Sequence, residues 1–325
     1  MDAFGGLLDG PRAHGAFALR SIMNPPWSVR IEDRAPLSLV AIARGEAWVV
    51  PDDGESARLD PGDIAILRGP VPYTFADDPA TPPQAVIHPG QHCTTPDGED
   101  LAQAMDLGVR TWGNDPNGST VVLVGTYEQH SAVSQRLLAA LPPVVVLEKQ
   151  TWDSPLTRML ADEIVKDEPG QEVVLDRLLD LLLVAALRVW FSRPDAEAPA
   201  WYRAHSDPVV GKAMAMLHHN PAHPWTVAML AAEIGLSRAS LARRFTELVG
   251  EAPMTFLTGW RLALAADLLR EPDATIGSVA REVGYGSPFA LSTAFKRAYG
   301  ISPKQHRLAA RSASRSLAST VPGKQ

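Results

Sequence analysis

The sequence predicts an α+β protein with an N-terminal β-barrel followed by an all-α domain that contains two helix-turn-helix units. Residues 1–147 carry short β-branched stretches separated by Gly and Pro, which is typical of an antiparallel barrel or sandwich. From about Ser154 onward, apolar residues recur at helical spacing. A segment of nearly thirty residues that starts at Thr226 is repeated from Thr275, which indicates a duplicated helical unit.

The order of these patterns divides the chain into four parts. Residues 1–150 are expected to form the β domain, and residues 151–200 a helical segment for dimerisation or signal relay. The first helix of this segment is expected to start at Ser154 as its N-cap, and the segment contains the wide apolar face of "LDRLLDLLLVAALRVW". Residues 201–307 hold the duplicated unit. Residues 308–325 contain few large apolar side chains and are expected to be disordered.

Charge is distributed unevenly along the 325 residues, whose net charge is −7. Residues 201–325 contain 15 Lys and Arg against 8 Asp and Glu, whereas the first 200 residues contain 15 against 29. This asymmetry indicates an anionic partner for the C-terminal part, and nucleic acid is the commonest such partner.

The remaining composition favours a cytoplasmic protein without a membrane span. Cys93 is the single cysteine, so no disulfide can form within the chain, which suits a reducing compartment. The N-terminus lacks the pattern of a secretion signal. The most apolar run is broken by Asp180 and Arg188 and is too short to cross a bilayer, so a buried or dimerising helix is expected there.

The two copies of the repeat have the same order of helix-capping and turn residues. "TVAMLAAEIGLSRASLARRF" and "TIGSVAREVGYGSPFALSTAF" each have a Thr cap, an inward Ala, a Gly turn and a Ser that starts a second helix. This order is typical of a helix-turn-helix whose second helix enters the major groove of DNA. Two such helices, joined by the apolar "MTFLTGWRLALAADLLRE", can reach successive grooves about 34 Å apart. The alternative is a helical bundle whose arginines only solvate its surface.

These motifs, with "VAREVGYGSPFALSTAFKRAYGISPKQHR", resemble the DNA-binding domain of the AraC family of transcription regulators over residues 207–307. The resemblance implies recognition helices at residues 237–245 and 287–295, with Arg243 as the main base contact and Lys296 and Arg297 on phosphates. The family often has Arg where this chain has Thr293, which favours apolar or shape readout by the second helix. The full set of expected DNA-binding residues is Arg238, Ala239, Ala242, Arg243, Arg244, Ser287, Pro288, Phe289, Thr293, Lys296 and Arg297.

The N-terminal part resembles a cupin barrel of the kind found in front of AraC-type DNA-binding domains. "LDPGDIAILRGPVPYTF" matches the second cupin motif, but Tyr73 stands where cupin enzymes place a metal-binding His. The paired His and Glu of the first cupin motif have no counterpart around "SLVAIARGEAW". The resemblance therefore implies a sensor domain and not an enzyme, and a cupin-type metal enzyme with an accessory helical domain is the alternative.

The sequence leaves three chemical classes of effector possible: a metal ion, an oxidant and an organic ligand. "IHPGQHCTTPDG" places His88, His92 and Cys93 within six residues, and with His130 these could bind zinc or a similar metal. A thiol beside His can also react with oxidants, whereas an ordinary polar loop with a buried Cys would have no sensing role. An organic ligand inside the barrel would be lined by the aromatic residues Trp27, Trp48, Tyr73 and Trp112, which otherwise form plain core.

The sequence thus predicts a sequence-specific regulator of transcription, controlled by a signal sensed in the N-terminal domain. Its expected partners are double-stranded promoter DNA, RNA polymerase, a second copy of the chain, and a small-molecule, metal or redox effector. A purely architectural DNA-binding protein is a further alternative, which a signal-dependent change in DNA affinity would exclude.

Overall fold

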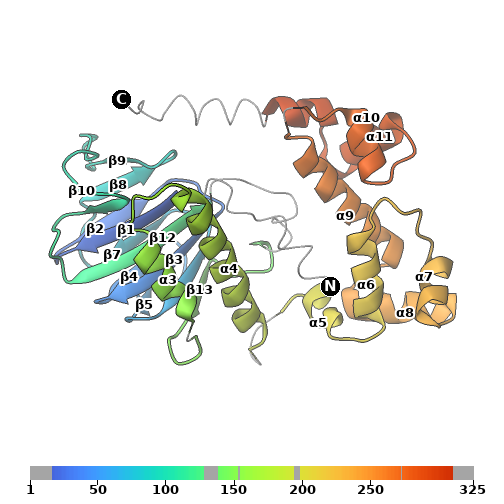
Figure 1. The fold of residues 1–325 in the computed structure, drawn as a ribbon, viewed down its shortest axis with the longest axis horizontal. Coiled ribbons are helices and arrows are strands. Elements are labelled where there is room, and N and C mark those ends of the chain that lie inside the picture. The colour runs from blue at the N-terminus through green and yellow to red at the C-terminus, as the bar shows by residue number, and fades with distance from the viewer. Residues whose placement is uncertain (1–16, 128–137, 153, 194–197, 272, 310–325) are drawn as a thin grey trace. The chain divides into compact units, whose positions relative to one another are not determined.

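The computed structural model describes residues 17–127, 138–152, 154–193, 198–271 and 273–309 (Figure 1). The described chain divides into two compact units: a β unit within residues 17–127 and 141–193, and a helical unit within residues 198–309 that also includes residues 138–140. The predicted fold class is confirmed, because a β-rich domain precedes a helical one. His130 and residues 310–325 of the predicted tail lie outside the described residues.

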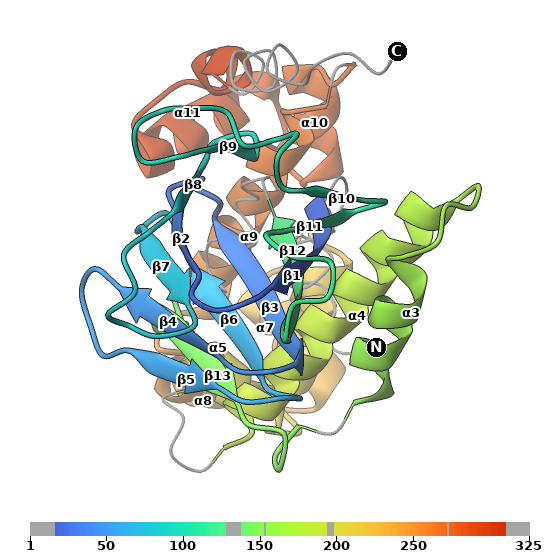
Figure 2. The same ribbon diagram turned by 90° about the vertical axis from the view of Figure 1, so that its left-hand side faces the viewer.

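The β unit consists of two facing sheets. The seven-stranded sheet has the order β10-β11-β1-β12-β3-β6-β13, and the six-stranded sheet the order β5-β4-β7-β2-β8-β9 (Figure 2). In the described residues the two sheets are not joined by hydrogen bonds into a closed barrel, so the predicted barrel is an open sandwich. The strands are β1 (Phe17–Met23), β2 (Ser28–Ile31), β3 (Leu37–Arg44), β4 (Ala47–Pro51), β5 (Ala57–Leu59), β6 (Ile64–Arg68), β7 (Tyr73–Ala76), β8 (Ala85–His88), β9 (His92–Thr94), β10 (Asp106–Gly108), β11 (Thr111–Gly113), β12 (Thr120–Tyr127) and β13 (Val144–Leu147).

A short turn takes the chain from the seven-stranded sheet to the six-stranded sheet. β3 belongs to the seven-stranded sheet and β4 to the six-stranded sheet, and only two residues separate them. Gly45 in this turn has φ 73°, and a Cβ there would lie 2.7 Å from Thr120 Oγ1, so the turn requires glycine. The Pro-Gly-Asp turn is fixed differently: the buried Asp63 accepts hydrogen bonds from the backbone N–H groups of Asp60 and Lys149.

An apolar core fills the space between the sheets. Both sheets contribute to it, and Trp27, Ile42, Val49 and Leu59 are fully buried there. Because side chains already occupy this interior, the sandwich is stabilised by packing in the manner of an ordinary protein core.

Two helices cover the other face of the seven-stranded sheet: α3 (Pro155–Glu163) and α4 (Gln171–Phe191) (Figure 2). The first six residues of β3 are all buried, as expected for a strand covered on both faces. Gly125 of β12 lets α4 approach closely, because a Cβ there would collide with Leu179. The Tyr127 hydroxyl donates a hydrogen bond of 2.9 Å to the Leu179 carbonyl. The helix pair is therefore packed as part of the β unit.

The helical unit contains seven named helices among its described residues, and residues 303–309 are also helical. In the described parts of both units, no helix is long and apolar enough to cross a membrane. The helices are α5 (Ala200–His205), α6 (Val210–His219), α7 (Val227–Ile234), α8 (Arg238–Val249), α9 (Pro253–Leu268), α10 (Ile276–Glu282) and α11 (Pro288–Tyr299).

The repeat in the sequence corresponds to a repeat in structure. We call α7 with α8 the first head and α10 with α11 the second head. Thr226 and Thr275 cap the leading helices, and Ser237 and Ser287 cap the following ones, each through a side-chain oxygen that accepts a backbone N–H. The turn glycines have nearly equal φ values, 80° at Gly235 and 81° at Gly284.

The two heads have separate cores. Ala231 and Ala280, predicted to face inward, are 2% and 1% exposed. Phe245 and Phe295 are completely buried at matching positions of α8 and α11. Each head is thus a small packed unit, and α9 contributes apolar residues to both cores.

A contact between the heads adds to this shared helix. The guanidinium of Arg261, in α9, donates hydrogen bonds to the carbonyls of Pro221 (2.6 Å) and His223 (2.8 Å), in the loop that leads into the first head. The turn of the second head approaches the same loop, since a Cβ at Gly284 would lie 2.7 Å from the Cα of Ala222. Burial lowers the pKa of Arg261 from its usual value, and the two carbonyls supply hydrogen-bond acceptors to the buried guanidinium. The heads are therefore held in one arrangement.

Candidate nucleic-acid interface

The exposed face of α8 carries most of the residues predicted for the first head. Arg238, Ala239 and Arg243 are exposed, and Ala242 is half-buried. Leu241 and Phe245, which alternate with them, are fully buried. Because the helix continues to Val249, one turn beyond the predicted end, its exposed face is longer than the sequence indicated.

The three arginines of α8 have different surroundings. Arg243 pairs with Glu247 one turn later, at 3.1 Å, and 71% of its side chain is exposed. Such an exposed ion pair contributes little to the free energy of folding, so the guanidinium remains available to a binding partner. Arg244 instead pairs at 2.6 Å with Asp207, whose side chain is 16% exposed.

The Arg244–Asp207 pair ties the recognition helix to the helices before it. Asp207 also accepts hydrogen bonds from the backbone N–H groups of Val209 and Val210, at the start of α6. The Arg244 guanidinium holds the pKa of the Asp207 carboxyl below its usual value. Sequence reasoning placed Arg244 among the DNA contacts and did not find this partner, which lies 37 residues earlier.

The exposed face of α11 is more apolar. Phe289 has 80% of its surface exposed, the largest fraction among the exposed large hydrophobic residues described. Pro288 and Thr293 are exposed beside it, while Ser287 is half-buried and caps the helix. Its side chains are more suited to apolar contact with bases than to hydrogen bonding, and apolar or shape readout by this helix stays a prediction.

Lys296 and Arg297 lie in the last turn of α11, and both are exposed. Cations near a helix C-terminus interact favourably with the helix dipole, so part of their role is local. Each has the long, flexible side chain that phosphate contacts use.

The predicted metal residues are only partly brought together. In the β8–β9 hairpin His88 pairs with His92, and their ring centroids lie 5.9 Å apart. His88 Nε2 lies 3.0 Å from Thr94 Oγ1, and His92 Nε2 lies 3.2 Å from Asp100 Oδ2. In the residues that the structure describes, no group of three or more His, Cys, Asp or Glu is placed to hold a metal.

Cys93 faces away from these histidines. It pairs with Ile87 across the hairpin, so its side chain points to the opposite face from His88 and His92. It is 5% exposed and belongs to the core between the sheets. Burial, with a smaller effect of Asp100, raises the pKa of the thiol to about 11, so the nucleophilic thiolate is scarce at neutral pH.

The aromatic residues considered for an organic ligand are mostly core. Trp27 is fully buried and packs against Phe75 at 5.4 Å between ring centroids. Tyr73 and Trp112 pack against the same core, and burial raises the pKa of the Tyr73 hydroxyl. Trp48 lies between the buried Ala47 and Val49 along β4, so its side chain points to the other face of the sheet.

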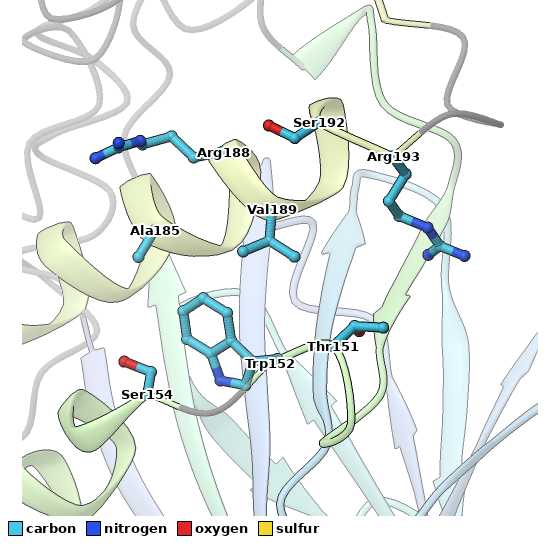
Figure 3. Close-up of a pocket in the computed structure, with 8 residues that line it drawn as sticks. All are labelled: Thr151, Trp152, Ser154, Ala185, Arg188, Val189, Ser192 and Arg193. Atoms are coloured by element: carbon cyan, nitrogen blue, oxygen red, sulfur yellow. The ribbon is translucent and has the colours of Figure 1, made fainter.

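The β unit also has an open pocket that the sequence did not indicate (Figure 3). It has a volume of about 680 Å³ and lies between the segment that follows β13 and the C-terminal half of α4. Its lining residues are Thr151, Trp152, Ser154, Ala185, Arg188, Val189, Ser192 and Arg193.

Two family models match the chain and together cover both units. Residues 2–192 match a cupin family, and residues 230–309 match a helix-turn-helix domain family. The cupin match covers more than half of the chain.

The chain is similar to known transcription regulators. A putative AraC-like transcription regulator of Streptomyces lividans is 33% identical over 287 residues, which cover 86% of this chain and 90% of that protein. The transcriptional regulator AlkR of Acinetobacter baylyi is 27% identical over 313 residues, 94% of this chain and 99% of its own. Among solved structures, the DNA-binding domain of the global transcriptional factor AdpA, in complex with a target DNA, is 36% identical, with a TM-score of 0.31, and covers 33% of this chain and 96% of its own.

The relatives are regulators of transcription and not enzymes, in agreement with the missing cupin ligands. With its cupin part, its duplicated helix-turn-helix and these relatives, the chain belongs to the AraC-like family of transcription regulators.

Proposed function

We propose that this regulator reads promoter DNA with the exposed faces of α8 and α11, and that Arg243 is its principal base contact. The observation that carries the proposal is the doubled head itself: two matching caps, two matching glycine turns and two buried phenylalanines present two exposed helix faces. Arg243 is the most suitable base reader, because its side chain is 71% exposed and its exposed partner Glu247 competes weakly.

Two substitutions separate base reading from phosphate binding. Arg243→Ala is expected to relax sequence preference, because a bidentate Arg–guanine contact contributes roughly 1–3 kcal/mol of discrimination. Lys296→Ala is expected to weaken binding to specific and random DNA equally, and to lower the salt dependence by about one charge. Fluorescence anisotropy measures both the sequence preference and the salt dependence. The probes are an operator fragment, selected from random DNA by the wild-type protein, and a scrambled fragment, each at several salt concentrations.

Lys166→Ala, which changes an exposed lysine of the β unit, is the control and should change neither affinity. Equal losses on specific and random DNA for both variants would contradict the division of roles. Binding of the wild-type protein to random DNA alone would contradict the proposal as a whole.

The β unit is proposed to sense the effector. The tight core between its sheets and the absence of a metal-ligand cluster among the described residues favour a small molecule over a metal bound between the sheets. Since the target is chromosomal DNA, the proposal includes action in the cytoplasm and contact with RNA polymerase at the promoter.

A homodimer through α3 and α4 is also proposed. These helices leave large apolar side chains exposed on the side away from the sheet: Met159 by 52%, Val173 by 61% and Leu181 by 53%. An apolar face of this kind on a helix pair is typical of an association surface.

Leu181→Glu is expected to convert a dimer into a monomer, because it would bury a charge in the interface. The control is Val71→Glu, which changes an equally exposed valine (49%) of the loop between β6 and β7. Sedimentation equilibrium at micromolar concentration gives the mass, and a monomeric wild-type protein would contradict the proposed dimer.

A further inference from the structure

The pocket on the β unit has an apolar centre between two arginines. Trp152, which is 4% exposed, lies opposite Ala185 and Val189 of α4, and Arg188 and Arg193 extend in opposite directions from the helix end (Figure 3). Its volume of about 680 Å³ falls within the range of small-molecule sites. The pocket lies on the face of the seven-stranded sheet that α4 covers, outside the packed core between the sheets.

Two described lining residues, Ser154 and Arg188, offer hydrogen-bond donors to a ligand. Ser154 Oγ accepts the Leu156 N–H at 3.3 Å as the cap of α3, so its own O–H remains available. The Arg188 side chain is exposed and makes no hydrogen bond or ion pair with another described residue. Among the described lining residues both charged side chains are arginines, so the pocket favours an anion.

The two arginines are not equivalent. Arg193 donates to the Val146 carbonyl at 3.4 Å, and its guanidinium lies 4.9 Å from the centre of the Trp190 ring, so it is held in place by the protein itself. Arg188 has five donors without such partners. Arg188, with Ser192 one turn later, is therefore the suitable carboxylate-binding end of the pocket.

We propose that this pocket is a binding site for a small organic carboxylate with an aromatic or aliphatic body. The carboxylate pairs with Arg188, and the apolar body packs on Trp152, Ala185 and Val189. The inference rests on the proposed effector-sensing role of the β unit, and it specifies where the effector binds and its chemical class.

The position of the pocket gives binding a route to the helical unit. Thr151, Trp152 and Ser154 follow β13, whereas Ser192 and Arg193 directly follow α4, and the chain continues from there to α5 of the helical unit. A ligand that bridges these two segments stabilises one arrangement of the α4 end. Binding is therefore expected to change the affinity of the full chain for DNA.

The test uses the full-length protein and two pairs of probes in isothermal titration calorimetry. Phenylacetate and hexanoate are the carboxylates, and phenylethanol and hexanol are their neutral counterparts; inorganic phosphate is the anion without an apolar body. Binding of at least one carboxylate is expected, with weaker or no binding of the alcohols and of phosphate. Arg188→Gln should weaken carboxylate binding about tenfold or more, since it removes a charge-assisted bond.

Arg177→Gln is the matched control: it changes an exposed arginine of the same helix, outside the pocket, and should leave binding unchanged. Ala185→Phe, which fills the centre of the pocket, should abolish binding. No binding of either carboxylate to the wild-type protein, or equal binding to Arg188→Gln, would overturn the proposal. Equal binding of phosphate would reduce the pocket to a simple anion site.

A last measurement separates this inference from the proposed function. DNA binding of Arg188→Gln without any probe should equal that of the wild-type protein, because Arg188 lies in the β unit. Failure of the wild-type protein to prefer an operator sequence would contradict the DNA-reading proposal, whatever the calorimetry gives. Specific DNA binding that no carboxylate changes would remove the regulatory route alone.

Discussion

The two heads of the helical unit share a frame and differ in their exposed faces. Their capping residues, turn glycines and buried phenylalanines correspond almost position for position. The exposed positions differ, however. Arg238 and Arg243 of α8 correspond in the repeat to Pro288 and Thr293 of α11, and Ala239 corresponds to the exposed Phe289. The inner positions thus preserve a common geometry, while the outer positions are free to acquire different recognition chemistry.

The largest effect that tests this comparison is expected in the two cores. Phe245→Ala and Phe295→Ala each remove a fully buried ring and should destabilise their own head by about 3–5 kcal/mol. Hydrogen exchange of the full-length protein should then accelerate in α8 for the first variant and in α11 for the second. Phe289→Ala is the control, because its 80% exposed ring contributes little to the core. Faster exchange in both heads from either variant would show that their cores are not separate.

A smaller and unequal effect is expected at the two turn glycines. Alanine in the left-handed conformation costs about 1–2 kcal/mol, and Gly235→Ala should cost only this, because a Cβ there meets nothing within 4 Å. Gly284→Ala should cost more, because its Cβ would lie 2.7 Å from the Ala222 backbone. Denaturant-dependent hydrogen exchange of each head measures the difference. Equal losses would mean that the loop yields without cost, and that the heads are less firmly joined than their contact indicates.

The smallest effect concerns the ion pair that only the first head has. Arg244 lowers the pKa of Asp207, so the pair stabilises the fold fully above the usual carboxyl pKa of about 3.9 and loses its effect as pH falls through the lowered value. Arg244→Gln should therefore reduce the thermal stability of the protein at pH 7, and the difference from the wild-type protein should shrink at pH 3. The second head has Ala294 at the corresponding position and supplies no such pair.

Arg243→Gln is the control for that pH dependence, because its partner Glu247 is 56% exposed. A stability difference for Arg244→Gln that is as large at pH 3 as at pH 7 would mean that the side chain acts through packing and not through the carboxylate.

The sequence predicted the parts of the molecule that depend on interactions between residues close together in the sequence. Thr226, Thr275, Ser237 and Ser287 cap helices as expected, because a capping side chain bonds to a backbone N–H only a few residues away. The repeat also located both buried phenylalanines. The residues that form each of these features lie within one or two helical turns of one another, so periodicity and spacing are sufficient to find them.

What could not be predicted depends on distant segments. Asp207 lies 37 residues before Arg244, and no local pattern joins them. The pocket takes residues from two segments that meet only because α4 packs on the sheet. Cys93 and His92 are adjacent in sequence, and only the pairing of β8 with β9 decides that one faces the core and the other solvent. For the same reason, strand content indicated a barrel or a sandwich, and only the pairing distinguished the two.

The bond network of Arg261 and the close approach of Gly284 to Ala222 have a further consequence. A protein whose two recognition helices are held at a fixed separation discriminates between DNA sites by the spacing of their half-sites as well as by their bases. Its two half-sites must be kept at a constant phase of the double helix. One inserted base pair would turn the second half-site by about a tenth of a turn and displace it from its helix, although every base that the protein reads would still be present. We therefore expect the operator of this regulator to be specified by the spacing of its half-sites as well as by its base sequence.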